Sequence, residues 1–132
     1  GVFESAVAAL FKVKRERLGV MDIEVKASMF EVQGDTVRDL LLPSVSSNAS
    51  SGPRVSITIG GKLDGLSEKV VDTDKKAVAL LRLGFSNRSP PHPNPPSHQV
   101  FRLTVTSTPR GPSDSSMHAG VGGLTLVLLG QA

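Results

Sequence analysis

The sequence predicts an α/β fold in which helices flank a mixed central sheet. Apolar residues recur with a period near 3.6 in some segments and near 2 in others, which indicates both helices and strands. These segments follow the order helix, strand, helix, strand pair, helix, strand, strand. With 132 residues, of which 39% are hydrophobic, the chain can build one modest core. We expect incomplete sheet edges, because the outermost strands would have no neighbour within the chain.

The first two elements follow from clear periodicity. In Val2–Arg17 the apolar residues return about every 3.6 positions and basic residues crowd the last turns, which favours a helix. Gly19 is expected to stop this helix. Val20–Val32 then alternates apolar and polar side chains, which predicts a strand.

Shorter elements are expected in the next part of the chain. Gly34–Asp35 indicates a turn, and Thr36–Leu42 is predicted as a short helix that ends before Pro43. Ser44–Pro53 has the small and polar composition of a loop. The alternation in Arg54–Ile59 predicts a short strand after that loop.

A hairpin and a second helix should follow. Gly60–Gly61 is expected to turn the chain so that Leu63–Leu66 pairs back on the preceding strand. Asp72–Asp74 is a cluster of residues that favour a helix N-cap. The helix that it starts carries the apolar residues between 77 and 83, and Gly84 is expected to end it.

The last third of the chain combines two loops with two strands. Ser89–Ser97 holds five prolines in nine residues, which excludes a helix or a central strand and predicts a polyproline-like loop. Gln99–Ser107 is predicted as a strand, and Thr108–Gly120 as a polar loop. The continuous apolar run Leu124–Leu129 is typical of a strand buried on both faces.

Composition excludes several kinds of protein. The chain has no cysteine, so it has no disulfide framework, thiolate zinc site or cysteine nucleophile. The scarcity of aromatic residues argues against single-stranded nucleic acid as a partner. No apolar run is long enough to span a membrane, and the first residues lack a signal-peptide pattern. The net charge of +3 suits a polyanionic partner without choosing one.

Six short segments together resemble the kinesin motor domain, in the order and with nearly the spacing of that family. The clearest holds Ser28, Glu31 and the run Asp39-Leu40-Leu41. The six segments are Gly1–Phe11, Val25–Leu41, Gly65–Val71, Leu80–Arg88, Ser97–Phe101 and Gly122–Val127. The resemblance implies a partial kinesin-type P-loop NTPase fold, with residues 1–132 covering the segment after the phosphate loop up to switch II.

The resemblance implies ATP and magnesium as cofactors of the family, but the residues that would hold them are missing here. No Gly-Lys-Ser or Gly-Lys-Thr string occurs, and the nearest match, Gly60–Leu63, is interpreted as a turn. We therefore expect no cofactor within this chain. In the family the phosphate loop lies upstream of the segment that this chain resembles.

Both switch motifs of the family are degenerate in this sequence. At switch I the chain keeps counterparts of the asparagine, serine and histidine as Asn94, Ser97 and His98, but the Ser-Ser-Arg core is missing. At switch II, Leu128 stands at the position of the family's aspartate, and Gly130 is the candidate switch glycine. A leucine cannot hold a water molecule or a metal shell, so we predict no catalytic residue and no metal ligand.

From these features we predict a kinesin-like microtubule-binding domain that has no ATPase activity of its own. We expect it to act in the cytoplasm, on the cytoskeleton. Arg54 and Lys62 are the candidate microtubule contacts, because the matching family region faces tubulin. The alternative is a fragment of an active ATP-dependent motor whose phosphate loop lies upstream. A third possibility is a fragment without autonomous function, since its sheet lacks flanking strands.

Several other residues admit two interpretations. His98 could be a switch histidine or a structural residue at the start of a strand, and the irregular spacing of His92, His98 and His118 does not favour a metal site. The prolines before Ser97 could dock on an aromatic groove or serve as a spacer. The basic residues that end the first helix could meet an acidic filament or simply face solvent. Glu31 and Asp39 are interpreted as structural rather than catalytic.

Overall fold

The computed structural model describes residues 1–42, 54–89, 95–111 and 119–130. Two helices and seven strands lie in these ranges, and none of the helices there is long and apolar enough to cross a membrane. The elements are α1 (Val2–Glu16), β1 (Met21–Gln33), β2 (Thr36–Asp39), β3 (Arg54–Ile57), β4 (Leu63–Asp64), β5 (Lys69–Val70), α2 (Asp74–Ser86), β6 (Ser97–Pro109) and β7 (Gly120–Leu128).

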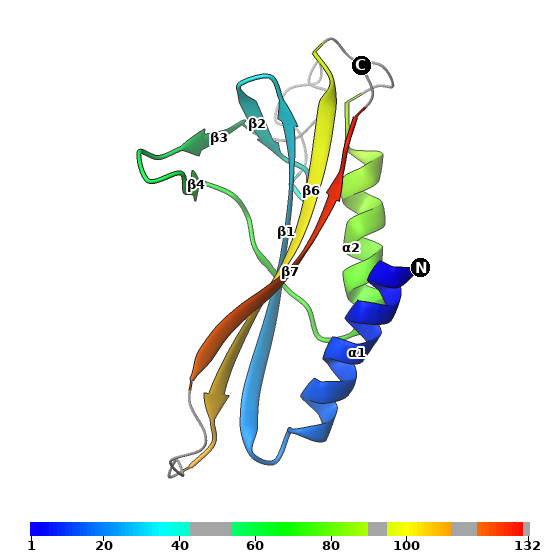
Figure 1. Ribbon diagram of the computed structural model, residues 1–132, viewed down its shortest axis with the longest axis vertical. Helices are drawn as coiled ribbons and strands as arrows, with labels where there is room; N and C mark the ends of the chain where they lie inside the picture. The colour runs from blue at the N-terminus through cyan, green and yellow to red at the C-terminus, as the bar shows by residue number, and fades with distance from the viewer. Residues whose placement is uncertain (43–53, 90–94, 112–118, 131–132) are drawn as a thin grey trace.

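One strongly twisted sheet organises the chain (Figure 1). Its strand order is β4-β3-β2-β1-β6-β7, and β5 pairs with β1. The prediction of a mixed sheet is wrong for the described residues, where every ladder is antiparallel. One strand–helix–strand connection typical of α/β folds is nevertheless present. β5 and β6 both run antiparallel to β1, so they point in the same direction, and α2 connects them.

The main core lies between the two helices and one face of the sheet. Figure 1 shows α1 and α2 on the same side of β1 and β6. The buried side chains Val25, Ala27 and Met29 of β1 alternate along the strand toward this layer, where they meet Val7 and Phe11 of α1. In the part of the chain that the structure describes, the helices therefore cover one face of the sheet and do not flank both.

A smaller apolar cluster forms on the opposite face of the sheet. Phe30, Val37 and Val55 come from β1, β2 and β3, and they are all buried. Leu63 of β4 and Leu66, just after the hairpin, pack against them. This cluster attaches the β3–β4 hairpin, which projects from the sheet as an arm in Figure 1.

Residues 36–42 form a strand and the start of a bend, so the predicted short helix is wrong. Gln33 and Thr36 are partners in the β1–β2 ladder, which leaves Gly34 and Asp35 as a two-residue turn. Gly34 has a φ of 61°, a conformation that hairpin turns of this length require and glycine adopts without strain. The turn therefore places Thr36 and Val37 opposite β1, and these β-branched residues favour the strand that pairs with it.

The C-terminal strand was predicted to be buried on both faces, and this is also wrong in the described residues. β7 pairs with β6 alone there, and its residues are at best half-buried. Val121 is 76% exposed and Val127 is 51% exposed, since no helix covers that face. The predicted loop at 44–53, the centre of the proline-rich loop and most of the second polar loop lie outside the described residues.

Both helices were predicted, and α2 begins as expected. The Thr73 hydroxyl accepts a hydrogen bond from Lys76 N at 3.1 Å, which is an N-cap contact. Gly84 does not end the helix as predicted, because α2 continues to Ser86 and is capped at Asn87. Gly84 is instead a contact position: it is buried against the side chain of Met29 on β1.

We expect Gly84→Ala to destabilise the protein, although alanine is the better helix former. A Cβ at this position would overlap Sδ of Met29 and crowd its Cγ and Cε, and Met29 is itself fully buried. Overpacking of this kind costs about 1–3 kcal/mol, against about 1 kcal/mol gained in helix propensity. Urea denaturation followed by far-UV circular dichroism measures the difference. In a Met29→Ala background the same substitution should become neutral or stabilising, and equal effects in both backgrounds would contradict the packing role.

Candidate functional site

The structure brings three of the four predicted switch residues together. Ser97 begins β6, His98 follows it, and Gly130 lies just beyond the end of β7. The Gly130 amide donates a hydrogen bond to Nδ1 of His98 at 2.9 Å. Asn94, the fourth residue, lies outside the described residues. This cluster, Ser97–His98–Gly130, is called the switch cluster below.

Three polar atoms of the switch cluster, the Ser97 hydroxyl oxygen, Nδ1 of His98 and the Gly130 amide nitrogen, have internal partners. The Ser97 hydroxyl accepts a hydrogen bond from Gln99 Nε2 at 2.9 Å, and Ser97 is 5% exposed. Gly130 packs so closely on the backbone of Ser97 that a Cβ would overlap its carbonyl oxygen. The glycine is therefore required by packing, and its amide is already engaged by His98.

Leu128 occupies the last position of β7, opposite Gln99 of β6. It brings an aliphatic side chain to the place where the family pattern has a carboxylate. Among the described residues no group of three or more histidine, aspartate or glutamate side chains could hold a metal ion. His92 and His118, which the sequence analysis considered together with His98, lie outside these residues.

The two predicted filament contacts lie on the β3–β4 hairpin. Arg54 is exposed on β3, opposite Arg38 of β2, so two arginines lie side by side on neighbouring strands. Lys62 is held in the turn: Thr58 N donates to the Lys62 carbonyl at 2.8 Å, and Lys62 N donates to the Thr58 hydroxyl at 3.2 Å. Gly61, with a φ of 80°, permits that turn.

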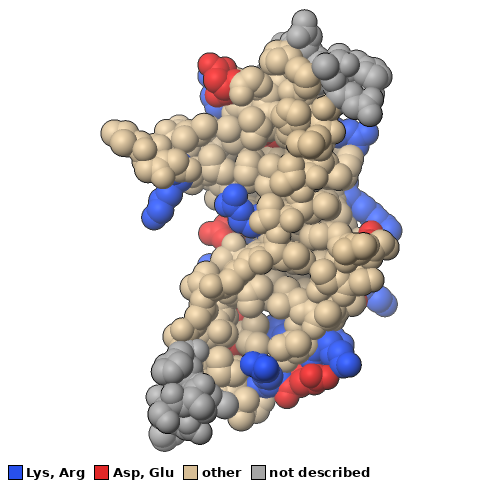
Figure 2. All heavy atoms as spheres, in the orientation of Figure 1, with Lys and Arg blue, Asp and Glu red and all other residues tan. Residues whose placement is uncertain are grey.

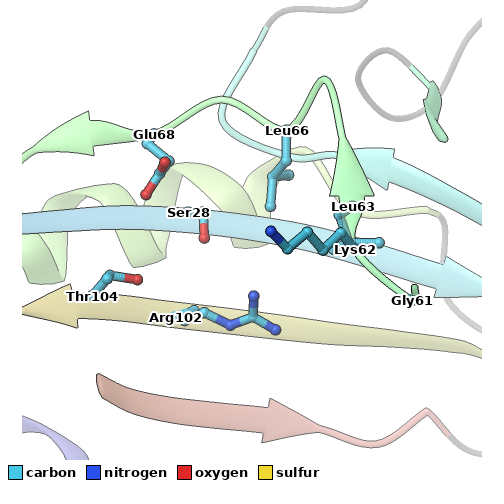
Figure 3. Close-up of a pocket in the computed structure, with 8 residues that line it drawn as sticks. All are labelled: Ser28, Gly61, Lys62, Leu63, Leu66, Glu68, Arg102 and Thr104. Atoms are coloured by element: carbon cyan, nitrogen blue, oxygen red, sulfur yellow. The ribbon is translucent and has the colours of Figure 1, made fainter. Parts of the chain in front are cut away.

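A cavity of about 350 Å³ lies beneath the hairpin, on the face of the sheet that the helices leave open. Figure 3 shows Lys62 extending along β1 toward Ser28, while Arg102 lies along the neighbouring strand β6. Glu68 and Thr104 line the far end of the cavity, and Leu63 and Leu66 line its hairpin side. We call this cavity the hairpin pocket.

Comparison with known proteins decides the ancestry. Residues 1–130 match the kinesin motor domain family. The chain belongs to this family. It is 29% identical over 133 residues to Kinesin-like protein KIF13B of Homo sapiens, a match that covers 96% of the chain and 7% of that protein. It is 28% identical over 134 residues to Kinesin-like protein KIN-7L of Oryza sativa subsp. japonica, covering 96% of the chain and 20% of that relative.

A third relative, Kinesin-like protein klp-3 of Caenorhabditis elegans, is 26% identical over 113 residues, which is 82% of the chain and 18% of that protein. The chain thus spans a fifth or less of the length of these kinesins. It is a partial kinesin motor domain. The family has an α/β fold, and the sheet and two helices described here correspond to only a part of it.

The kinesin Asp-Leu-Leu motif has a structural role in this chain. Asp39 is fully buried, and its carboxylate accepts hydrogen bonds from Leu41 N at 2.9 Å and from Ser67 N at 2.7 Å. Asn87, in the kinesin segment after α2, donates to the Leu40 carbonyl at 2.8 Å. Three segments of the kinesin resemblance that are far apart in sequence are therefore joined by hydrogen bonds that are buried or partly buried.

Glu31 makes a second internal link of the kinesin segment. It is 1% exposed, and its carboxylate accepts a hydrogen bond from Ser89 N at 2.7 Å and another from the Ser89 hydroxyl. The geometry agrees with a structural interpretation of Glu31 and Asp39, since both side chains are buried and accept hydrogen bonds from backbone amides. The sequence did not single out Arg102 or Ser89, and it named Ser28 only as part of the family resemblance. Only the strand alternation that places Ser28 and Arg102 on one face could have indicated that these two residues share a site.

Proposed function

We propose that this chain is a microtubule-binding domain of the kinesin family that does not turn over ATP by itself. The match to the motor domain over residues 1–130 carries the proposal, because kinesins are a microtubule-binding motor family. In this proposal the chain acts in the cytoplasm, on the cytoskeleton, and its partner is the microtubule. It needs neither nucleic acid nor a membrane.

The switch cluster supports the absence of ATP turnover. Phosphoryl transfer needs free donors for the γ-phosphate and a held magnesium ion. Here the Gly130 amide already donates to Nδ1 of His98, and Leu128 supplies no oxygen ligand for magnesium. The described residues therefore do not fit a magnesium–nucleotide complex, and no Gly-Lys-Ser or Gly-Lys-Thr loop occurs in the 132 residues.

The β3–β4 hairpin supports the choice of binding surface. Arg54 and Arg38 are direct neighbours across two strands, and like charges in this arrangement repel each other unless an anion intervenes. Figure 2 shows basic side chains gathered beneath the projecting arm of the molecule. An acidic filament surface would relieve this repulsion, so we assign Arg54 and Lys62 as microtubule contacts.

Co-sedimentation with taxol-stabilised microtubules tests this surface. We expect the wild-type chain to pellet, and the double variant Arg54→Gln/Lys62→Gln to bind about tenfold more weakly at low salt, since each exposed ion pair contributes up to about 1 kcal/mol. Lys76→Gln is the matched control, because Lys76 is an exposed lysine on α2, away from the hairpin. Equal pelleting of both variants would contradict the assignment.

One observation favours the alternative function, a fragment of an active ATP-dependent motor. The chain spans a fifth or less of its kinesin relatives, so a phosphate loop could be supplied from an upstream part of a longer protein. Microtubule-stimulated phosphate release by that longer protein would establish this alternative. It would also require another residue to replace the missing carboxylate at Leu128.

A further inference from the structure

We propose that β7 is an interface between two copies of this chain, which pair antiparallel along their free β7 edges about a twofold axis at Thr125. This self-association is independent of the proposed microtubule binding, because β7 lies at the opposite end of the sheet from the β3–β4 hairpin. The product is a closed dimer in which one sheet continues through both copies.

The outer edge of β7 lacks the features that usually keep sheet edges apart. Proteins protect such edges with charged side chains, prolines, bulges or very short strands. β7 runs for nine residues, Gly120–Leu128, without a charged residue or a proline, whereas β4 at the other edge has two residues. Within the described ranges β7 pairs with β6 alone, in an unbroken register. The backbone N–H and C=O groups on its outer side can therefore bond another strand.

An apolar groove of about 380 Å³ lies beside this edge, between α1 and β7. Four residues of α1 and four residues of β6 and β7 line it, and none of the eight is polar: Ala6, Ala9, Leu10, Val13, Val105, Gly122, Gly123 and Leu124. α1 thus has apolar residues outside its buried face, and Val13 among them is 40% exposed. A strand added to β7 would place its helix-facing side chains in this groove.

The residues of β7 are complementary in size to those of a second β7 that runs antiparallel to it. The first half of the strand is rich in glycine, and the second half carries large aliphatic side chains. With the axis at Thr125, Gly122 lies opposite Leu128 of the second copy, and Gly123 lies opposite Val127. A Cβ built at Gly122 meets no atom within 4 Å, so the space that this leucine needs is open.

The same register covers the exposed apolar residues on the open face of the sheet. Val121 is 76% exposed and Leu129 is 77% exposed, and the axis brings Val121 of each copy opposite Leu129 of the other. Thr125 meets its own counterpart at the axis, where two threonines can share a hydrogen bond. One register therefore pairs small with large residues along the strand and covers its most exposed apolar side chains.

The interface has the size of a weak, specific dimer. The strand is about 30 Å long, and the sheet layer with the adjacent part of α1 is about 15–20 Å deep, so pairing removes roughly 1,000 Å² in total from water. This area lies at the lower end for specific interfaces, so we expect a dissociation constant in the micromolar range. Since β7 carries no charge, the constant should change little with salt.

Sedimentation equilibrium of the full chain, between about 1 and 100 µM, tests the proposal. We expect a monomer–dimer equilibrium that Gly122→Val weakens about tenfold, because the valine occupies the space of the incoming Leu128. The monomer should keep its fold, since the added side chain meets open space. Gly60→Val is the matched control: Gly60 is equally open but lies in the hairpin, and its variant should dimerise as wild type does.

Cross-linking tests the register. The chain has no cysteine, so Thr125→Cys introduces a single thiol. Residues directly opposite in an antiparallel pair have Cα atoms about 4.5–5.5 Å apart, which is within the range for a disulfide. Oxidation by diamide should therefore convert most of Thr125→Cys to a covalent dimer. Lys76→Cys, with its thiol exposed on α2, should remain mostly monomeric under the same conditions.

Four results would overturn the proposal. These are a monomer at every concentration, association of Gly122→Val equal to wild type, species larger than a dimer, and equal cross-linking of Thr125→Cys and Lys76→Cys. Microtubule pelleting separates this proposal from the proposed function. A β7 dimer that does not pellet removes microtubule binding and leaves the dimer, whereas a chain that pellets but stays monomeric in solution leaves the function and removes the dimer.

Discussion

Replacing Asp39 with alanine is expected to destabilise the protein by about 3–5 kcal/mol. The Asp39 carboxylate is fully buried and accepts hydrogen bonds from the amides of Leu41 and Ser67. Hydrogen bonds to a charged group contribute about 1.5–3 kcal/mol each, and the substitution leaves both amides without this partner. Since domains are stable by only about 5–15 kcal/mol, this single change would remove a large part of the total.

Two variants make the Asp39 result interpretable. Asp39→Asn keeps one acceptor oxygen and should lose about half as much stability as alanine. Asp64→Ala removes an exposed aspartate from β4 and should change stability by less than about 0.5 kcal/mol. Urea denaturation monitored by circular dichroism at 222 nm is the measurement, because the chain has no tryptophan or tyrosine for fluorescence. Equal urea midpoints for Asp39→Ala and Asp64→Ala would show that the hydrogen bond from Ser67 N to the Asp39 carboxylate does not contribute to the free energy of unfolding.

Replacing Glu31 with alanine is expected to cost about 3 kcal/mol. Its carboxylate lies in the interior and binds both the amide and the hydroxyl of Ser89, 58 residues away in sequence. Alanine would leave two buried polar groups of Ser89 unpaired and a void where the side chain was. The contact connects β1 to Ser89, just after α2, so its loss should also loosen Ser89 from the sheet.

Glu31→Gln is the matched control for this contact. The glutamine oxygen can accept from the Ser89 amide while its NH₂ group donates to the Ser89 hydroxyl, so the variant should lose only about 1 kcal/mol. Glu24→Ala, which removes an exposed glutamate of the same strand, should lose less than about 0.5 kcal/mol. Thermal unfolding of the four proteins gives the ranking. A Glu31→Gln variant as unstable as Glu31→Ala would mean that burial of charge, rather than the hydrogen bonds, dominates this position.

Elements with strong periodicity were predictable from the sequence. The helix at the N-terminus, the strand that follows it and the hairpin around Gly60–Gly61 all occur where the pattern placed them. The predicted cap also occurs, because Thr73 accepts the hydrogen bond of an N-cap. These elements depend on local side-chain order and turn chemistry, both of which are visible in a single sequence.

Features that depend on distant contacts were missed. Thr36–Leu42 has helix-compatible spacing, but the turn at Gly34 pairs it with β1 instead. Gly84 resembles a helix terminator, yet it lies inside α2 because Met29 needs the space. The apolar run of β7 predicts a strand buried on both faces, but in the described part of the chain no residue of β7 is fully buried. In each case the deciding neighbour is many residues away or is absent from the described part of the chain.

The candidate site was predictable in part. Ser97, His98 and Gly130 were chosen by family resemblance, and the structure places them in contact. Their role in nucleotide binding remains a prediction, as does the role of Asn94 and of the cations Arg54 and Lys62. Arg102 escaped notice because an arginine in a strand has no local signature, and only the register of β1 and β6 brings it to the hairpin pocket.

Microtubule co-sedimentation with and without nucleotide tests the central proposal most directly. The folded chain would be mixed with microtubules in the absence of nucleotide, with ATP and magnesium, and with a non-hydrolysable ATP analogue. We predict that the chain pellets equally in all three conditions, because the Gly130 amide is already bonded to His98 and Leu128 offers no carboxylate for magnesium. Pelleting that ATP weakens would contradict this and show that a nucleotide pocket survives. A folded chain that stays in the supernatant throughout would remove microtubule binding and leave only the kinesin ancestry.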